Sequence, residues 1–518
     1  MAENQGEVLP MKLIYGVKDR PKPGQLILFA LQQLLAILAA TITVPIVVNS
    51  NTGSDMSISA ALFGAGAGTL VYLLFTKFKS PVFLGSSFAF IGSMTAAFAG
   101  AASMSMGYLG LLIGAVFAGL VYVIIAVAVH FAGVKWIDKV MPAVVIGPTV
   151  ALIGLSLSGS AVSNALSTVT DASGNYVMDL HAILCLICAL ATLAVTIVCS
   201  VYGKKMLKMI PFIIGILSGY VLAAIFTAFS YIPGADAGLR IIDFTLFNDM
   251  QWVPDFTFVE ALFLNDFAVE AGDVGAYIGT IAVAYIPVAF VVFAEHLADH
   301  KNISSIIEHD LLTDPGLSRT LLGDGIGSIV GAVFGGCPNT TYGESIGCVA
   351  ISGNASVVTI LTTSLLAIVA SFIAPFVTFL ATIPSCVMGG VCIALYGFIA
   401  VSGLKMIQKV DLNENNNLFV VSTILVTGVG GMALSFGQVT ITAIACALIL
   451  GILVNVLVNI GNKKNRASGT APGAAAEAPV LKENVQGEAV TDASDLVEEA
   501  AAADAAQTAQ EADDESVS

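Results

Sequence analysis

The sequence predicts an all-α protein that crosses a membrane many times, and its composition and hydropathy are the observations that predict this. Of its 518 residues, 57% are hydrophobic and only 11% are charged, and the mean hydropathy is +0.91. A soluble domain carries roughly 25% charged residues, so this chain has too few charges to solvate a globular surface. Apolar stretches of about 20 residues, long enough to cross a hydrocarbon core of about 30 Å, recur along the chain.

These stretches, and the breaks between them, predict fourteen transmembrane segments. The ninth and tenth segments are short and rich in Gly. The predicted segments are 25–48, 57–76, 82–100, 107–132, 141–160, 180–202, 209–231, 274–298, 320–335, 338–353, 355–382, 386–404, 416–434 and 439–460.

The positions of Lys and Arg support this count. If the N-terminus is cytoplasmic, the chain returns to the cytoplasm after every even-numbered segment, and of the 20 basic residues only Arg240 falls on the other side. Because basic residues concentrate in cytoplasmic loops, we expect both termini to be cytoplasmic. A cytoplasmic N-terminus (1–23) is expected to precede the membrane domain (24–466). The tail 467–518 holds 12 acidic residues and one Lys, and is predicted to be disordered.

The eight Cys residues lie mostly within apolar segments. Cys185 and Cys188 form a CxxC pair, but no further thiols follow at metal-ligand spacing. Buried Cys residues acting as small hydrophobic side chains are the preferred interpretation. No disulfide framework, metal, cofactor or nucleic-acid partner is predicted.

A short motif occurs twice, seven segments apart. Segment 5 opens at Pro142 and segment 12 opens at Pro384, both with the pattern P-x-x-V-[IM]-G. Because seven is odd, repeats of seven segments would lie in the membrane with opposite orientations. Inverted repeats of this kind are typical of secondary transporters, which bind substrate where corresponding segments are interrupted. Such interruptions are expected at 85–90 (GSSFAF) in segment 3 and at 337–344 (CPNTTYGE) in segment 10.

Charged residues within the predicted segments are few, and two carboxylates among them are the candidate site residues. Glu295 ends the apolar run of segment 8, and Glu344 follows the interruption in segment 10. A charged group at this depth is costly and is by default a functional hypothesis. The alternatives are that Glu295 reaches water at the cytoplasmic end, and that Glu344 is stabilised by the dipole of a helix that begins there. Two carboxylates beside free backbone groups suit a planar heterocycle and proton coupling. This chemistry alone does not exclude a dipeptide, a cation or an anion as the substrate.

Four strings together resemble the nucleobase–ascorbate transporter family, and within it they are most similar to the bacterial uracil permeases. The resemblance covers about residues 10–465. The strings are GSSFAF at 85–90, AEH at 294–296, DLLTDPG at 310–316 and PNTTYGE at 338–344.

The resemblance implies two inverted repeats of seven segments, with short antiparallel strands in segments 3 and 10 that cross at the substrate. It implies a core domain (about 24–132 and 274–382) and a gate domain (about 141–231 and 386–460). The protein would form a homodimer through the gate domain. The resemblance further implies that the protein imports uracil by proton symport across a bacterial inner (cytoplasmic) membrane. Such a protein is not an enzyme.

The resemblance also assigns residues to these tasks. Glu295 and Glu344 would bind the pyrimidine edge, and Phe88 and Gly343 would offer backbone groups. Glu295 and Asp299 would carry the proton. The full set of implied substrate-binding residues is Ser87, Phe88, Ala89, Glu295, Tyr342, Gly343 and Glu344.

Three positions depart from the uracil permease pattern: Asp299 and Gln33 each replace a His, and Ser345 replaces an Asn. Asp299, four residues after Glu295, would lie over it on one helix face and could share its proton. His300 would point about 140° away from Glu295 and is not expected to substitute for the missing His. The rival functions are a purine (xanthine or urate) permease of the same family, and an anion exchanger or non-transporting membrane scaffold of related fold.

Overall fold

The structure is a computed structural model that describes residues 13–133, 142–167, 175, 177–204, 206–263, 274–436 and 439–467. The chain divides into two units, Met1–Asn459 and Ile460–Ser518. The first unit contains the helices described below, except that the last of them, Ala443–Ala467, ends in the second unit. Residues 1–12 of the predicted N-terminus, and all of the predicted disordered tail except Ala467, lie outside the described residues.

Eight helices in the described part of the chain are long and apolar enough to cross a membrane, counting α6 and α7 as one. They show that the protein is a multi-pass membrane protein, as predicted. Their bounds are α1 Pro23–Thr52, α2 Ile58–Phe75, α4 Met104–Ala132, α6 Ala143–Ser156, α7 Ser158–Leu166, α8 Leu180–Tyr202, α10 Pro211–Ser230, α12 Val274–Ile307 and α17 Ser385–Ile407.

The other elements are shorter or less apolar. The remaining α-helices are α3 Ile91–Ala99, α9 Met206–Met209, α11 Thr257–Leu262, α13 Leu317–Gly335, α14 Gly343–Ser352, α15 Val357–Ser371, α16 Ala374–Ala381, α18 Asn415–Val429 and α19 Ala443–Ala467. Short 3-10 turns are η1 Phe88–Phe90, η2 Ala237–Leu239 and η3 Phe244–Asp249, and η4 Leu312–Gly316 is a π turn. The strands are β1 Leu84–Ser86, β2 Asn339–Thr341, β3 Leu434–Phe436 and β4 Val439–Ile441.

Several helices begin and end where the local sequence favours it. The Ser57 hydroxyl caps α2 by accepting from the Ala60 amide, and Ser103 caps α4 in the same way. Gly53 ends α1 with a φ of 69°, a left-handed conformation that Gly adopts without steric cost.

Three predicted segments, 11, 13 and 14, differ from the structure. Segment 11 (355–382) is not one helix, because α15 and α16 are bent by 83° at their junction. A Pro in the first turn of α16 has no N–H to extend the preceding helix. At the end of segment 13 and the start of segment 14, β3 and β4 pair antiparallel, with Leu434 opposite Ile441. Gly431, with a φ of 70°, follows the end of α18 and separates that helix from β3.

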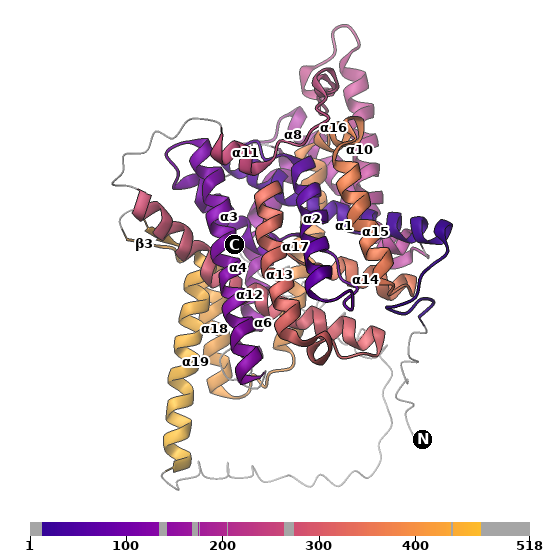
Figure 1. Cartoon of the computed structure of the whole chain (residues 1–518). Helices are drawn as coiled ribbons and strands as arrows, with labels where there is room; N and C mark the ends of the chain where they lie inside the picture. The colour runs from indigo at the N-terminus through magenta and orange to yellow at the C-terminus, as the bar shows by residue number, and fades with distance from the viewer. Residues whose placement is uncertain are drawn as a thin grey trace, which may run out of the picture. The chain divides into compact units, whose positions relative to one another are not determined.

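The helices, which are labelled in Figure 1, make contacts that divide them into two groups. In the first group, α13 packs against α2 and α4, α12 against α3 and α4, and α1 against α14 and α15. In the second, α17 packs against α6, α7 and α8, α10 against α8, and α18 against α6. Small residues allow close approach in the first group: a Cβ added to Gly68 of α2 would lie 2.6 Å from the Gly327 carbonyl oxygen of α13.

Candidate functional site

Two short strands cross where sequence analysis expects segments 3 and 10 to be interrupted. β1 pairs with β2 antiparallel, with Leu84 opposite Thr341 and Ser86 opposite Asn339. The Ser87 amide continues the ladder by donating to the Pro338 carbonyl at 3.0 Å. The predicted non-helical backbone and its antiparallel strands are therefore confirmed.

Neighbouring side chains hold the strands in place. The Leu84 amide donates to Thr69 Oγ1 of α2 at 2.9 Å, and Asn339 Nδ2 donates to the Gly64 carbonyl of α2 at 2.9 Å. The Tyr342 hydroxyl donates to the Ser86 carbonyl at 2.7 Å. These bonds satisfy buried polar groups that the short ladder leaves unpaired, which is a condition for non-helical backbone at membrane depth.

Each strand leads directly into a helix start. β1 is followed by η1 at Phe88 and then α3, and β2 is followed by α14 at Gly343. No side chain caps the start of η1 or of α14. The first amides of a helix have no partner within it, so these two starts can donate to a bound ligand. Glu344 lies in the first turn of α14, where the helix dipole favours a carboxylate.

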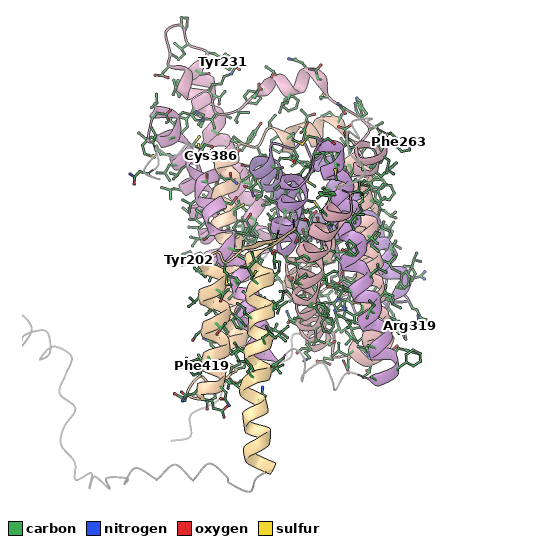
Figure 2. All side chains as sticks on the ribbon, turned by 90° about the vertical axis from the view of Figure 1, so that its left-hand side faces the viewer. Tyr202, Tyr231, Phe263, Arg319, Cys386 and Phe419 are labelled. Atoms are coloured by element: carbon green, nitrogen blue, oxygen red, sulfur yellow. The ribbon has the colours of Figure 1, made fainter. Side chains whose placement is uncertain are left out.

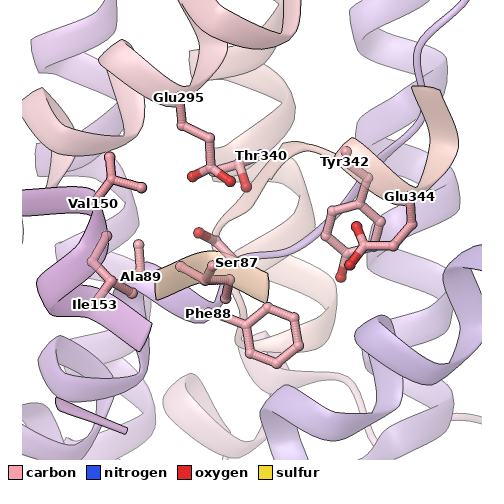
Figure 3. A pocket seen from close by; sticks show the side chains of 11 residues that line it. Ser87, Phe88, Ala89, Val150, Ile153, Glu295, Thr340, Tyr342 and Glu344 are labelled. Carbon is pink, nitrogen blue, oxygen red and sulfur yellow. The ribbon is translucent and has the colours of Figure 1, made fainter. Parts of the chain in front are cut away.

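A cavity of about 60 Å³ lies where the two helix starts meet (Figure 3). All seven implied substrate-binding residues line it, and Figure 3 shows Glu295 and Glu344 approaching it from different elements. The Phe88 ring packs edge-on against Tyr396 of α17, with centroids 5.7 Å apart. The cavity exceeds the roughly 10–15 Å³ that a single water needs.

A second cavity of about 330 Å³ shares part of this lining. Glu295, Gly343 and Glu344 line both cavities, whereas Asp299 lines the larger one. Asp299 lies one turn after Glu295 on α12 and accepts a hydrogen bond of 2.7 Å from Thr341 Oγ1 of β2. The expected proximity of Glu295 and Asp299 on one helix face agrees with their shared cavity.

The histidines of α12 face away from these cavities. His296 Nδ1 lies 2.6 Å from Asp324 Oδ2 of α13, and its Nε2 lies 3.0 Å from Thr320 Oγ1. His300 Nε2 lies 2.7 Å from the Tyr72 hydroxyl of α2. His300 lines neither cavity, in agreement with its expected direction. Within the described residues, no group of three or more His, Cys, Asp or Glu side chains is arranged to hold a metal ion.

Several residues that line the site were not predicted from the sequence. Val150 and Ile153 of α6, Ile399 of α17 and Thr340 of β2 all line the smaller cavity. The repeated P-x-x-V-[IM]-G motif marks α6 and α17, but it does not show which turn of each helix faces the ligand. Asp324 is a buried acid within a predicted segment, so the cost of intramembrane charge is a signal that could have identified it.

Comparison with known proteins identifies the family of this chain. The model of the family described as "Permease family" matches residues 24–436. The uracil permease of Bacillus caldolyticus is 38% identical, over 86% of this chain and 95% of that protein, and the uracil permease of Escherichia coli K12 is 34% identical, over 85% and 93%.

Two solved structures share the fold at low identity. The transmembrane domain of the cyanobacterial bicarbonate transporter BicA has a TM-score of 0.56 and 16% identity, and the alignment covers 85% of this chain and 99% of that one. The murine Solute Carrier 26 family member A9 anion transporter has a TM-score of 0.57 and 13% identity, with 86% and 69% covered. The extent of the family match and the identity to the curated permeases show that this chain belongs to the permease family and is a transporter rather than an enzyme.

Proposed function

We propose that the protein imports uracil by proton symport, with alternating access to a site built on Glu295 and Glu344. The convergence of these two carboxylates and two uncapped helix starts on one small cavity carries the proposal. The uracil permeases among its relatives support the choice of nucleobase.

The cavity offers groups that complement a pyrimidine edge. Carboxylates accept hydrogen bonds from ring N–H groups, and the amides at Phe88 and Gly343 donate to ring carbonyl oxygens. The lining from Ser87, Ala89 and Tyr342 would limit the size of the ring. Two nearby carboxylates would repel a bare anion, which disfavours the rival anion exchanger.

Glu295 and Asp299 are the proposed proton carriers. Glu295 lines both cavities and Asp299 lines the larger one. A proton that Glu295 takes up beside the substrate can therefore pass to the Asp299 carboxylate, one helix turn away. Two close carboxylates favour sharing a proton over ionising together. Release of substrate would then accompany transfer of the proton toward the larger cavity.

The proposed architecture has fourteen segments in two inverted repeats, with a core domain (24–132 and 274–382) and a gate domain (141–231 and 386–460). The two packing groups support this division. We assign the eight long helices, the bent pair α15–α16 and the shorter helices α3, α13, α14, α18 and α19 to the fourteen proposed segments in chain order. Val150 and Ile399 of the gate line the same cavity as Glu295 of the core, so relative motion of the domains would open it alternately.

We place the protein in a bacterial cytoplasmic membrane with both termini inside, as a homodimer formed through the gate domain. Figure 2 shows Arg319 near one end of the helices and Tyr231 near the other. Basic residues follow the even-numbered segments, which supports this orientation.

Competition for uptake tests the substrate. Cells that express the protein and lack other pyrimidine transporters are given radiolabelled uracil with an excess of 5-fluorouracil, thymine, xanthine or bicarbonate. We expect 5-fluorouracil to block uptake and xanthine to leave it unchanged. Inhibition by xanthine without inhibition by 5-fluorouracil would support the purine permease instead.

Replacement of Glu295 by Gln tests proton coupling. We expect Glu295→Gln to abolish accumulation of uracil, whereas Glu260→Gln, a change on α11 away from both cavities, should retain it. An uncoupler should stop concentrative uptake by the unmodified protein. Accumulation that persists with the uncoupler would exclude proton symport.

A further inference from the structure

Three thiols and one imidazole form a cluster apart from the substrate cavities. His181, Cys185 and Cys188 lie on α8 at i, i+4 and i+7, the spacing of one helix face, and Cys386 lies at the start of α17. We propose that Cys185 is a site of oxidation by hydroperoxides, and that Cys386 resolves the oxidised sulfur to form a disulfide between α8 and α17.

The hydrogen bonds of His181 make it a base for the Cys185 thiol. His181 Nδ1 lies 3.0 Å from the Gly238 carbonyl oxygen, and a carbonyl only accepts, so Nδ1 carries the proton. In the neutral ring Nε2 then has a free lone pair. Nε2 lies 3.5 Å from Cys185 Sγ, so the thiol donates to it. Transfer of that proton gives a thiolate, the form of Cys that reacts with oxidants.

Cys386 is placed to resolve the oxidised thiol. Its thiol is a neighbour of the Cys185 and Cys188 thiols, and all three are free. Helices α8 and α17 approach closely one turn after Cys185 and Cys386, where a Cβ added to Gly390 would lie 3.0 Å from the Ala189 Cα. Figure 2 shows Cys386 toward the end of the helices where Tyr231 lies.

A separate cavity of about 290 Å³ gives an oxidant access to the sulfur. His181, Cys185 and Ser385 line it, together with Asp243 of the loop after α10 and Thr382 of the turn before α17. Cys185 is otherwise buried. The volume is many times the roughly 10–15 Å³ that one water requires, so a small peroxide fits.

The reaction balances with hydrogen peroxide as the oxidant. The Cys185 thiolate attacks one peroxide oxygen, the O–O bond breaks, and Cys185 becomes a sulfenic acid while the leaving hydroxide takes a proton to form water. The Cys386 sulfur then attacks the Cys185 sulfur, the S–O bond breaks, and a second water leaves. Both sulfurs are oxidised by one electron each and the peroxide is reduced by two.

Mass spectrometry of the full-length protein tests the proposal. Purified protein in detergent is treated with hydrogen peroxide, its free thiols are blocked with iodoacetamide, and it is digested without reductant. We expect one linked species that joins the Cys185 and Cys386 peptides. It should be lost in Cys185→Ser and Cys386→Ser, and kept in the matched variant Cys199→Ser on the same helix.

A second measurement isolates the first step. In Cys386→Ser, dimedone should trap the sulfenic acid on Cys185, while Cys392, buried in α17, serves as an unreactive internal control. His181→Phe should slow this trapping about tenfold, the effect of losing one charge-assisted hydrogen bond. The proposal is overturned if the folded protein forms no Cys185–Cys386 link under conditions that oxidise its thiols after denaturation, or if dimedone labels Cys188 instead.

Discussion

The side-chain amide of Gln33 on α1 donates a hydrogen bond of 2.5 Å to the Ser345 hydroxyl oxygen at the start of α14. The same amide lies 3.2 Å from the Ser345 carbonyl oxygen, and the Phe83 amide donates to the Ser345 hydroxyl at 3.1 Å. Ser345 therefore joins α1 and the chain entering β1 to the helix that carries Glu344. Both residues depart from the pattern that the family resemblance implies, and their contact indicates that the two replacements complement each other.

Replacement of Gln33 by Leu should weaken binding of uracil. The change removes the hydrogen bond from Gln33 to Ser345, whereas the hydrogen bond from the Phe83 amide remains. One buried hydrogen bond contributes about 1 kcal/mol, or about fivefold in affinity. We expect the KM of uracil uptake to rise about fivefold. Thr43→Val is the control on the same helix, because the Thr43 hydroxyl bonds the Ala39 carbonyl of α1 itself. An unchanged KM in Gln33→Leu would show that this contact does not position Glu344.

Gly85 leaves room for the Tyr342 ring, so Gly85→Ala should impair transport. A Cβ added at Gly85 would lie 2.8 Å from the Tyr342 hydroxyl oxygen and would also meet the ring. The ring cannot move freely, because its hydroxyl donates to the Ser86 carbonyl. Overpacking of this kind costs about 1–3 kcal/mol.

Uptake rate and the thermal unfolding temperature in detergent both test the Gly85 prediction. Gly92→Ala is the matched control, because a Cβ there meets nothing within 4 Å. We expect Gly85→Ala to lose most uptake and to unfold at a lower temperature, and Gly92→Ala to resemble the unmodified protein. Equal behaviour of the two variants would contradict the prediction.

The positions of the site's charged residues could be predicted from sequence, because a carboxylate within an apolar segment is costly wherever it lies. Glu295 and Glu344 stand out for this reason alone. The interruption at 337–344 could also be located, since its Pro, Gly and hydroxyl residues disfavour a helix. The contacts that hold the site together could not be predicted, because they join residues far apart in the sequence. Thr341 lies 42 positions from Asp299, and Gln33 lies 312 positions from Ser345.

Two further features could not be predicted from the sequence. These are the register of β1 and β2, and the pairing of β3 with β4. Three-residue strands are too short to show an alternating pattern, and the pairing of Gly85 with Thr340 depends on how α2 holds both strands. Hydropathy assigned Leu434 to segment 13 and 439–441 to segment 14, because these residues lie at the ends of apolar runs.

Loss of the Thr341 hydroxyl should slow transport more than it weakens binding. Thr341→Val removes the donor to the Asp299 carboxylate while keeping the side-chain shape. Hydrogen bonds to charged groups contribute about 1.5–3 kcal/mol, so we expect the maximal uptake rate to fall about tenfold or more. Because Asp299 lines the larger cavity and not the smaller one, the KM should change little.

Initial rates over a range of uracil concentrations separate these two quantities for Thr341→Val. Thr362→Val on α15, whose hydroxyl bonds its own helix at the Val358 carbonyl, is the control. A large rise in KM at an unchanged maximal rate would place Asp299 in substrate binding rather than in proton transfer.

The ion pair between Lys79 and Asp314 should make stability depend on pH. Lys79 Nζ, after α2, lies 2.5 Å from Asp314 Oδ1 in the turn between α12 and α13. The hydrogen bond from Lys79 is the main cause that lowers the pKa of Asp314, and the charges of Lys79 and His309 add to it. A carboxyl whose pKa is lower in the folded than in the unfolded protein stabilises the fold at a pH above its unfolded pKa of about 3.9. This stabilisation is lost as the pH falls through the folded pKa.

Asp314→Asn should therefore unfold at a lower temperature than the unmodified protein at pH 7, and this difference should disappear as the pH is lowered below about 4. Both partners are partly exposed, so the difference should be small and should also shrink in 1 M salt, where the Debye length is about 3 Å. Lys79→Met should give the same loss at pH 7, and combining the two changes should add nothing further because they remove one shared interaction. Thermal unfolding in detergent at pH 3 to 8 measures all four proteins. A difference that persists at low pH and high salt would mean that the amide introduced by Asp314→Asn disturbs the turn itself, and that loss of the charge is not the cause.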